Sequence, residues 1–217
     1  VRPSLGAHAR DSLKPPAPAF AFRVATNPQK IETIQKWPIP RNAKEVQMLL
    51  GAFGFYRRFI PNYAQVALPL TELTKKENVF CWTERCVNAL KQMKRSMTSA
   101  AVLRIFDPTL PTFLVTDASD FATGAVLEQL HADGRRPVEF FSMKLNDAQR
   151  KYPVHCKELL SIVESLSRWR HYLHGIKFIC ETDHSPLTHL KKQPKLCAMQ
   201  MRWIDKINEF DMEIVYK

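Results

Sequence analysis

Three carboxylates stand at places where a folded chain could bring them together. Asp117 follows the apolar run 113–115, and Asp183 follows a second strand-like run in the segment "KFICETDH". Glu158 lies beside the apolar stripe of the helical segment "HCKELLSIV". A carboxylate at the end of a core strand is costly unless a positive charge meets it. If the two strands are neighbours and the helix packs across them, the three carboxylates converge.

The chemistry that three converging carboxylates support is divalent metal binding. Like charges held close together are unfavourable unless a cation lies among them, and hard oxygen ligands favour Mg²⁺ or Mn²⁺. A pair of such ions about 3.5 to 4 Å apart is the usual arrangement for hydrolysing phosphodiesters. Any one of these acids alone is explained more simply as a turn or a helix cap. The trio, in this order of elements, favours a metal-dependent catalytic site formed by Asp117, Glu158 and Asp183.

The elements that would position these acids form an α/β domain over residues 107–217. Three strand-like runs open it, namely "TFLVTDAS", "GAVLEQL" and "RPVEFFSMKL". Asp133 and Gly134 predict a hairpin between the second run and the third. The remaining expected elements are a long helix at 147–173, a strand at 177–184, a helical turn at 186–192, a helix at 198–210 and a last strand at 212–217. The sequence thus predicts five strands with covering helices.

The first half of the chain has a different organisation. Residues 1–26 are rich in Pro and Ala with little periodicity, and we expect them to form an irregular lead-in. Residues 27–106 carry apolar residues at helical spacing, with capping residues such as Asn42 and Thr83. We expect this stretch to form a small helical subdomain.

Positive charge is concentrated in the same half. Residues 1–106 hold 17 Lys and Arg against six Asp and Glu, whereas residues 107–217 hold 15 of each. Either the helical half has a solvated basic face, or it binds an anionic polymer through phosphate contacts that do not depend on base sequence.

A basic and aromatic cluster lies within the helical half. Arg57 and Arg58 are expected to contact the phosphates of a nucleic acid. The aromatic neighbours Phe55, Tyr56 and Phe59 are expected to belong to the core.

Cysteine content and hydropathy exclude two classes of protein. The five cysteines are an odd number, which does not indicate a disulfide framework. No uninterrupted apolar run approaches the 18 or more residues of a membrane span. We therefore expect a reduced, intracellular and soluble chain with no membrane partner.

Four segments together carry a resemblance to a known family: "LLGAFGFYRRFIPNYA", "VTDASDFATGAVL", "KELLSIV" and "TDHSPL". They resemble the pol polyprotein of gypsy-type LTR retrotransposons, in which the thumb of the reverse transcriptase is followed directly by an RNase H domain. The resemblance covers about residues 22–217.

The resemblance implies both a fold and an activity. The fold is a thumb-like helical subdomain followed by an RNase H-like mixed five-stranded sheet with helices. Asp117, Glu158 and Asp183 fall on three metal-binding acids of that family, which cuts the RNA strand of an RNA·DNA hybrid with two Mg²⁺ or Mn²⁺ ions. The basic half would hold the hybrid by its backbone. In a longer polyprotein, the polymerase palm and fingers would lie upstream.

Two departures from the family pattern leave alternatives open. No Asp-Asp pair of the polymerase palm occurs, so DNA synthesis by this chain alone is not expected. The family's fourth acid lies on a final helix in a segment resembling "ADALSR", and this chain stops before it at "DMEIVYK". One alternative is a catalytically dead, transposon-derived nucleic-acid-binding remnant, and another is a piece that does not work by itself.

Overall fold

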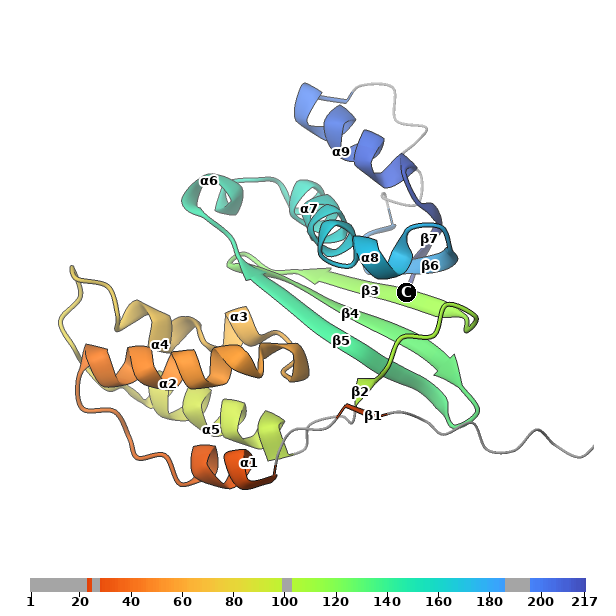
Figure 1. Ribbon diagram of the computed structural model, residues 1–217. Coiled ribbons are helices and arrows are strands. Elements are labelled where there is room, and N and C mark those ends of the chain that lie inside the picture. Colours follow the sequence, from red (N-terminus) through yellow and green to blue (C-terminus); the bar gives the residue numbers. More distant parts are fainter. Residues whose placement is uncertain (1–22, 25–27, 99–102, 186–195) are drawn as a thin grey trace, which may run out of the picture.

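The computed structural model describes residues 23–24, 28–98, 103–185 and 196–217. Figure 1 shows a twisted sheet with one group of helices on each side of it. Most of the expected lead-in and the expected helical turn at 186–192 lie outside the described residues. Arg23–Val24, which we expected in the irregular lead-in, instead form a short strand, β1, paired with β2 (Leu103–Arg104). Among the described residues, no helix is long and apolar enough to span a bilayer.

Residues 28–98, hereafter the helical part, pack around their own apolar cluster. The elements are α1 (Pro28–Gln35), α2 (Ala43–Phe55), the 3₁₀ helix η1 (Arg57–Phe59), α3 (Tyr63–Val66), α4 (Leu68–Glu72) and α5 (Glu84–Thr98). Helix α2 begins at the cap Asn42, whose side chain accepts a 2.9 Å hydrogen bond from the backbone N–H of Glu45. Its residues Val46, Leu49 and Phe53 are fully buried, as their spacing on one helical face predicts.

The second half forms a mixed sheet, which confirms the predicted fold class. The strands are β3 (Thr112–Ala118), β4 (Ala122–His131), β5 (Gly134–Lys144), β6 (Lys177–Thr182) and β7 (Asp211–Tyr216), in the order β5-β4-β3-β6-β7. β3, β4 and β5 are antiparallel neighbours, whereas β3, β6 and β7 run parallel. The predicted turn joins β4 to β5, and Gly134 has the positive φ of 101° that favours glycine there.

The single long helix expected at 147–173 is wrong. The chain forms α6 (Asp147–Arg150), α7 (Val154–Arg168) and α8 (Arg170–Leu173) instead. Pro153 separates the first two because proline has no N–H to donate and disfavours helical backbone at the residue before it. Because of this break, α7 begins separately at Val154 and its direction across the sheet is independent of α6.

The two groups of helices cover opposite faces of the sheet (Figure 1). Helix α7 packs on β3 and β4, and α9 (Ala198–Asn208) packs against α7. Their shared core includes Leu114, Leu127, Ile162 and Trp169, each at most 1% exposed. Helix α3 and η1 contact β5 on the other side.

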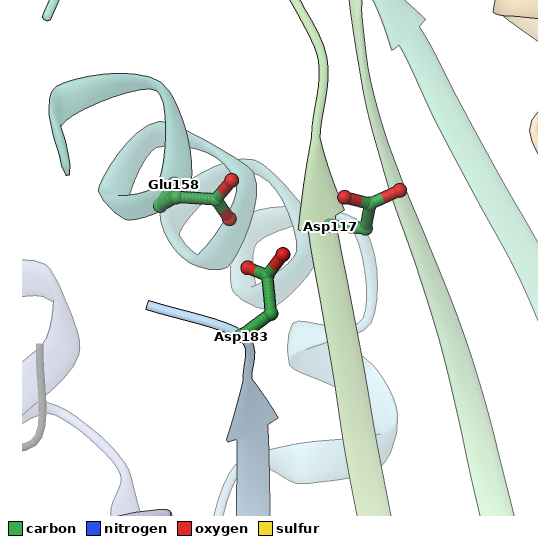
Figure 2. A group of neighbouring side chains, drawn as sticks. All are labelled: Asp117, Glu158 and Asp183. Carbon is green, nitrogen blue, oxygen red and sulfur yellow. The ribbon is translucent and has the colours of Figure 1, made fainter. Parts of the chain in front are cut away.

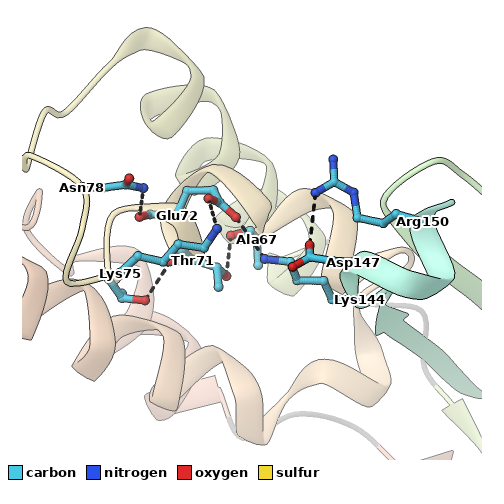
Figure 3. A network of polar contacts seen from close by, with 9 residues as sticks. Ala67, Thr71, Glu72, Lys75, Asn78, Lys144, Asp147 and Arg150 are labelled. Atoms are coloured by element: carbon cyan, nitrogen blue, oxygen red, sulfur yellow. Dashed lines mark hydrogen bonds and ion pairs between the residues drawn. The ribbon is translucent and has the colours of Figure 1, made fainter.

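A hydrogen bond and an ion pair connect the helical part to the sheet. The backbone N–H of Ala64 donates a 2.9 Å hydrogen bond to the hydroxyl of Ser142 on β5. Lys144 at the end of β5 ion-pairs with Glu72 of α4 at 3.0 Å, and Figure 3 shows this pair within a larger network. The two halves therefore meet at β5 through specific bonds.

Two phenylalanines on α2 test the helical core. Phe53 is fully buried and Phe55 is 73% exposed. We expect Phe53→Ala to lower the free energy of unfolding by about 3–5 kcal/mol, because it leaves a cavity. The matched control Phe55→Ala should change it by about 0.5 kcal/mol or less. Urea denaturation measures both, and equal effects would contradict this description of the core.

Candidate metal centre

The three acids singled out from the sequence lie together at one end of the sheet. Each of Asp117, Glu158 and Asp183 offers an oxygen atom, and these oxygens all lie within 4.8 Å of one another. Figure 2 shows Asp117 on β3, Asp183 directly after β6 and Glu158 on α7. Neighbouring strands and the helix that crosses them thus assemble the cluster.

Sheet register explains why the two aspartates are level with each other. β3 and β6 are parallel, and Thr116 pairs with Thr182, so the residue that follows each member of this pair in the chain is an aspartate. Parallel neighbours end at the same edge of a sheet, which places both carboxylates there.

Helix α7 is held over this edge by a side chain one turn after Glu158. The hydroxyl of Ser161, itself fully buried, lies 3.1 Å from both the carbonyl oxygen of Asp117 and that of Gly124. Glu158 and Ser161 are three residues apart and therefore share a helical face. The contact of Ser161 with the two strands therefore also places Glu158 close to the aspartates.

Glu158 is in an unfavourable electrostatic position. It is 3% exposed, whereas Asp117 and Asp183 are exposed. Burial, together with the negative charges of the nearby Asp183 and Asp117, raises the pKa of Glu158 to about 8, although a hydrogen bond from the backbone of Ala118 acts in the opposite direction. Its Oε2 atom is buried without a hydrogen-bond partner.

The basic residues of the described chain do not neutralise this cluster. The nearest one in sequence, the buried Lys157, forms a 2.7 Å ion pair with Asp120 instead. Three oxygen donors with an unsatisfied buried atom fit a hard divalent cation, since such an ion offsets the repulsion and gives Oε2 a partner. The fit rests on Asp117, Glu158 and Asp183 alone.

The two arginines expected to contact nucleic acid differ in their surroundings. Arg57 is exposed, whereas the guanidinium of Arg58 lies 3.9 Å from the buried carboxylate of Glu139 on β5. Tyr56 and Phe59 are buried as expected, but Phe55 is exposed, and its expected place in the core is wrong. It follows the last core position of α2, Phe53, by only two residues, which turns it to another face of the helix.

Sequence reasoning missed the approach of the helical part to this site. Asn62 and Gln65 line a narrow crevice together with Asp117 and Gly124. Asn62 has left-handed backbone with φ 50°, a conformation that asparagine tolerates better than most residues. The only signal was the dipeptide "PN" at 61–62, which marks a turn but not what the turn contacts.

Comparison with known proteins identifies the class of the domain. Residues 82–180 match the family model of the RNase H-like domain found in reverse transcriptase. Over 195 residues the chain is 37% identical to the Transposon Tf2-3 polyprotein of Schizosaccharomyces pombe, and equally to the Tf2-4 polyprotein of the same organism. These alignments cover 87% of this chain but only 15% of each polyprotein.

Solved structures share the fold. The foamy viral protease-reverse transcriptase dRH in complex with double-stranded DNA matches with a TM-score of 0.73 and 22% identity, over 89% of this chain and 35% of that one. The complex of the foamy viral protease-reverse transcriptase with an RNA/DNA hybrid matches with a TM-score of 0.68 and 21% identity, over 88% and 27%.

The chain therefore carries an RNase H-like domain of the reverse-transcriptase family and is a homologue of retrotransposon polyproteins over most of its length. The resemblance expected from the sequence is confirmed at this level. The chain spans about a seventh of the length of these polyprotein relatives.

The raised pKa of Glu158 predicts how stability depends on pH. Its ordinary value is 4.5, so between about pH 4.5 and 8 the folded protein retains a proton that the unfolded chain has lost. The metal-free protein should lose stability as pH rises through this window, by at most about 1.4 kcal/mol per pH unit. Glu158→Gln should remove that loss, so the variant should match the unaltered protein at pH 4.5 and exceed it at pH 8. Urea denaturation in EDTA measures both proteins, and parallel pH profiles would contradict the assignment.

Proposed function

We propose that Asp117, Glu158 and Asp183 bind two Mg²⁺ or Mn²⁺ ions and that the domain hydrolyses the RNA strand of RNA·DNA hybrids. The observation that carries the proposal is that oxygens of Asp117, Glu158 and Asp183 lie within 4.8 Å of one another, while the buried Oε2 atom of Glu158 has no hydrogen-bond partner. Membership of the RNase H-like family supports the reaction class. A related fold in complex with an RNA/DNA hybrid supports the kind of substrate.

Each acid has a part that follows from its surroundings. Glu158 would bind ions from the buried side as a carboxylate and release its proton to solvent as it does so. The exposed Asp117 and Asp183 would bind from the solvent side, where a scissile phosphate can approach. When bound, such ions activate water at neutral pH and stabilise the leaving oxygen. The expected products are a 3′-hydroxyl and a 5′-phosphate.

The helical part is proposed to act as a thumb of a reverse transcriptase. Residues 27–106 would hold the hybrid by its backbone, and residues 107–217 would form the nuclease domain. A polymerase palm and fingers would lie upstream in a longer polyprotein. The excess of positive charge in residues 1–106 supports binding to a polyanion.

The metal requirement and the roles of the acids have a common test. Asp117→Asn, Glu158→Gln and Asp183→Asn should each reduce cleavage of a labelled hybrid at least about a hundredfold, because a metal site supplies several kcal/mol of transition-state stabilisation. Asp211→Asn is the matched control, since Asp211 is exposed and lies on β7 outside the cluster. Mn²⁺ binding followed by calorimetry should weaken for the first three variants and not for the control.

Two outcomes separate the proposals. If the unaltered chain binds hybrid and Mn²⁺ but cuts nothing, the activity proposal fails for this chain. Metal-independent binding without cleavage would favour the alternative of a catalytically dead, nucleic-acid-binding remnant.

The neighbouring arginines provide a second test. Because Arg57 is exposed, Arg57→Ala should weaken hybrid binding and lower the slope of log Kd against log salt concentration by about one unit. Arg58 is close to Glu139, so Arg58→Ala should instead lower stability, by up to about 1 kcal/mol. Fluorescence anisotropy across a salt series and urea denaturation measure the two effects. The reverse pattern would contradict these assignments.

A further inference from the structure

One row of paired residues crosses the sheet from the three acids toward the helical part. Asp117 on β3 pairs with Gly124 on β4, and Gly124 pairs in turn with Ser142 on β5. We call Asp117, Gly124 and Ser142 the Asp117 row. Leu114 packs in the core beneath α7, so Asp117, three residues later on the strand, projects to the opposite face of the sheet. That opposite face is the one that the helical part covers (Figure 1).

The helical part contacts the Asp117 row at two adjacent points. The backbone N–H of Ala64 donates a 2.9 Å hydrogen bond to the hydroxyl of Ser142, which is buried. A Cβ atom added to Gly124 would lie 2.4 Å from the side-chain oxygen of Asn62, so glycine is what lets Asn62 come so close. Asn62 precedes α3 with its left-handed φ of 50°, and Ala64 lies in the first turn of that helix. Both contacts therefore come from the start of one helix.

The backbone of the same row is bonded to α7. The hydroxyl of Ser161 lies 3.1 Å from the carbonyl oxygens of both Asp117 and Gly124. This pair of strand residues thus lies between Ser161 of α7 and Asn62 of the helical part. The crevice that Asn62 lines with Asp117 and Gly124 has no room for a water molecule. A displacement of the row therefore changes its contacts on both faces, because no layer of solvent lies between them.

The charge of the three acids gives such a displacement a direction. Ionised carboxylates this close repel one another, and the repulsion pushes Asp117 away from the other two. Asp117 projects to the face covered by the helical part, so this movement presses the row against Asn62. A divalent cation reverses the force, because it attracts all three carboxylates. The arrangement of the row that suits a bound cation is thus also the one that suits docking of the helical part.

We propose that Asn62 and Ser142 are positioning residues through which docking of the helical part strengthens metal binding by the three acids. The inference rests on the metal binding of the proposed function and adds a link between that site and the other half of the chain. A link of this kind is reciprocal, so a bound metal ion strengthens docking of the helical part by the same factor. The helical part then regulates the metal site in addition to any contact with substrate.

Hydrogen exchange at one amide tests the reciprocal effect. The Ala64 N–H is bonded to the hydroxyl of Ser142, so its exchange reports opening of the contact with the sheet. Saturating Mg²⁺ should slow this exchange about fivefold or more. The Glu45 N–H is the matched control, because it too lies at the start of a helix and donates to a side-chain oxygen at 2.9 Å, that of Asn42. Its rate should change less than about twofold. NMR of the ¹⁵N-labelled full chain measures both amides.

A double-mutant cycle tests the contact between Asn62 and Gly124. Gly124→Ala adds a methyl group that displaces Asn62, and it should weaken Mn²⁺ binding about fivefold. Asn62→Gly keeps the positive φ but removes the contact, and it should weaken binding by a similar factor. In the Asn62→Gly background, Gly124→Ala should add less than about a twofold loss, because the methyl group then meets no side chain there. Calorimetry measures the Mn²⁺ affinity of all four proteins, and circular dichroism verifies that each is folded.

The outcomes distinguish this link from the proposed activity. An unchanged exchange rate at Ala64, or an equal slowing at Glu45, would overturn the link even though the chain binds metal. Equal losses from Gly124→Ala in both backgrounds would also overturn it, because the loss would then come from β4 itself. A slowed Ala64 amide in a chain that cuts no hybrid would support the link and refute the nuclease activity. A chain that binds no Mn²⁺ would refute both.

Discussion

Repulsion among three carboxylates has to be opposed by packing. Asp117, Glu158 and Asp183 place their oxygens within 4.8 Å, and burial makes ionised Glu158 more costly still. The packing of α7 on the sheet provides the favourable free energy that offsets this repulsion. The apolar side chains of this helix pack on β3 and β4, and buried Ser161 bonds to two strand carbonyls. A divalent cation would remove the conflict, which is why the packing and the cluster point to one chemistry.

The topology determines which residues can take part. Parallel pairing of β3 with β6 brings two strand ends to one edge, and the break at Pro153 lets α7 start there. On the other face, the helical part docks through β5 and reaches the same edge at Gly124. Two segments that are separate in the sequence thus border one site. The helical part is consequently placed to contact whatever the acids bind.

Much of this architecture could be predicted from the sequence. The strands could be predicted because apolar runs and a hairpin turn at Gly134 have local signatures. Asp117 and Asp183 follow two such runs, and Glu158 lies beside the apolar stripe of a helix. The break at Pro153 was missed because the apolar spacing continues across it. The contact of Asn62 with Gly124 depends on a left-handed residue and on tertiary docking, which no local pattern encodes. Long-range contacts of this kind form only when the sheet is assembled.

If the fold holds the three carboxylates together for a cation, the protonation of Glu158 must respond to that cation. The most direct test is a ¹³C NMR titration of the Glu158 carboxyl carbon with and without Mg²⁺. Without the ion, the midpoint should lie near pH 8. With saturating Mg²⁺ it should fall below the ordinary value of 4.5, because the ion stabilises the ionised form. A midpoint that is the same in both conditions would contradict the account.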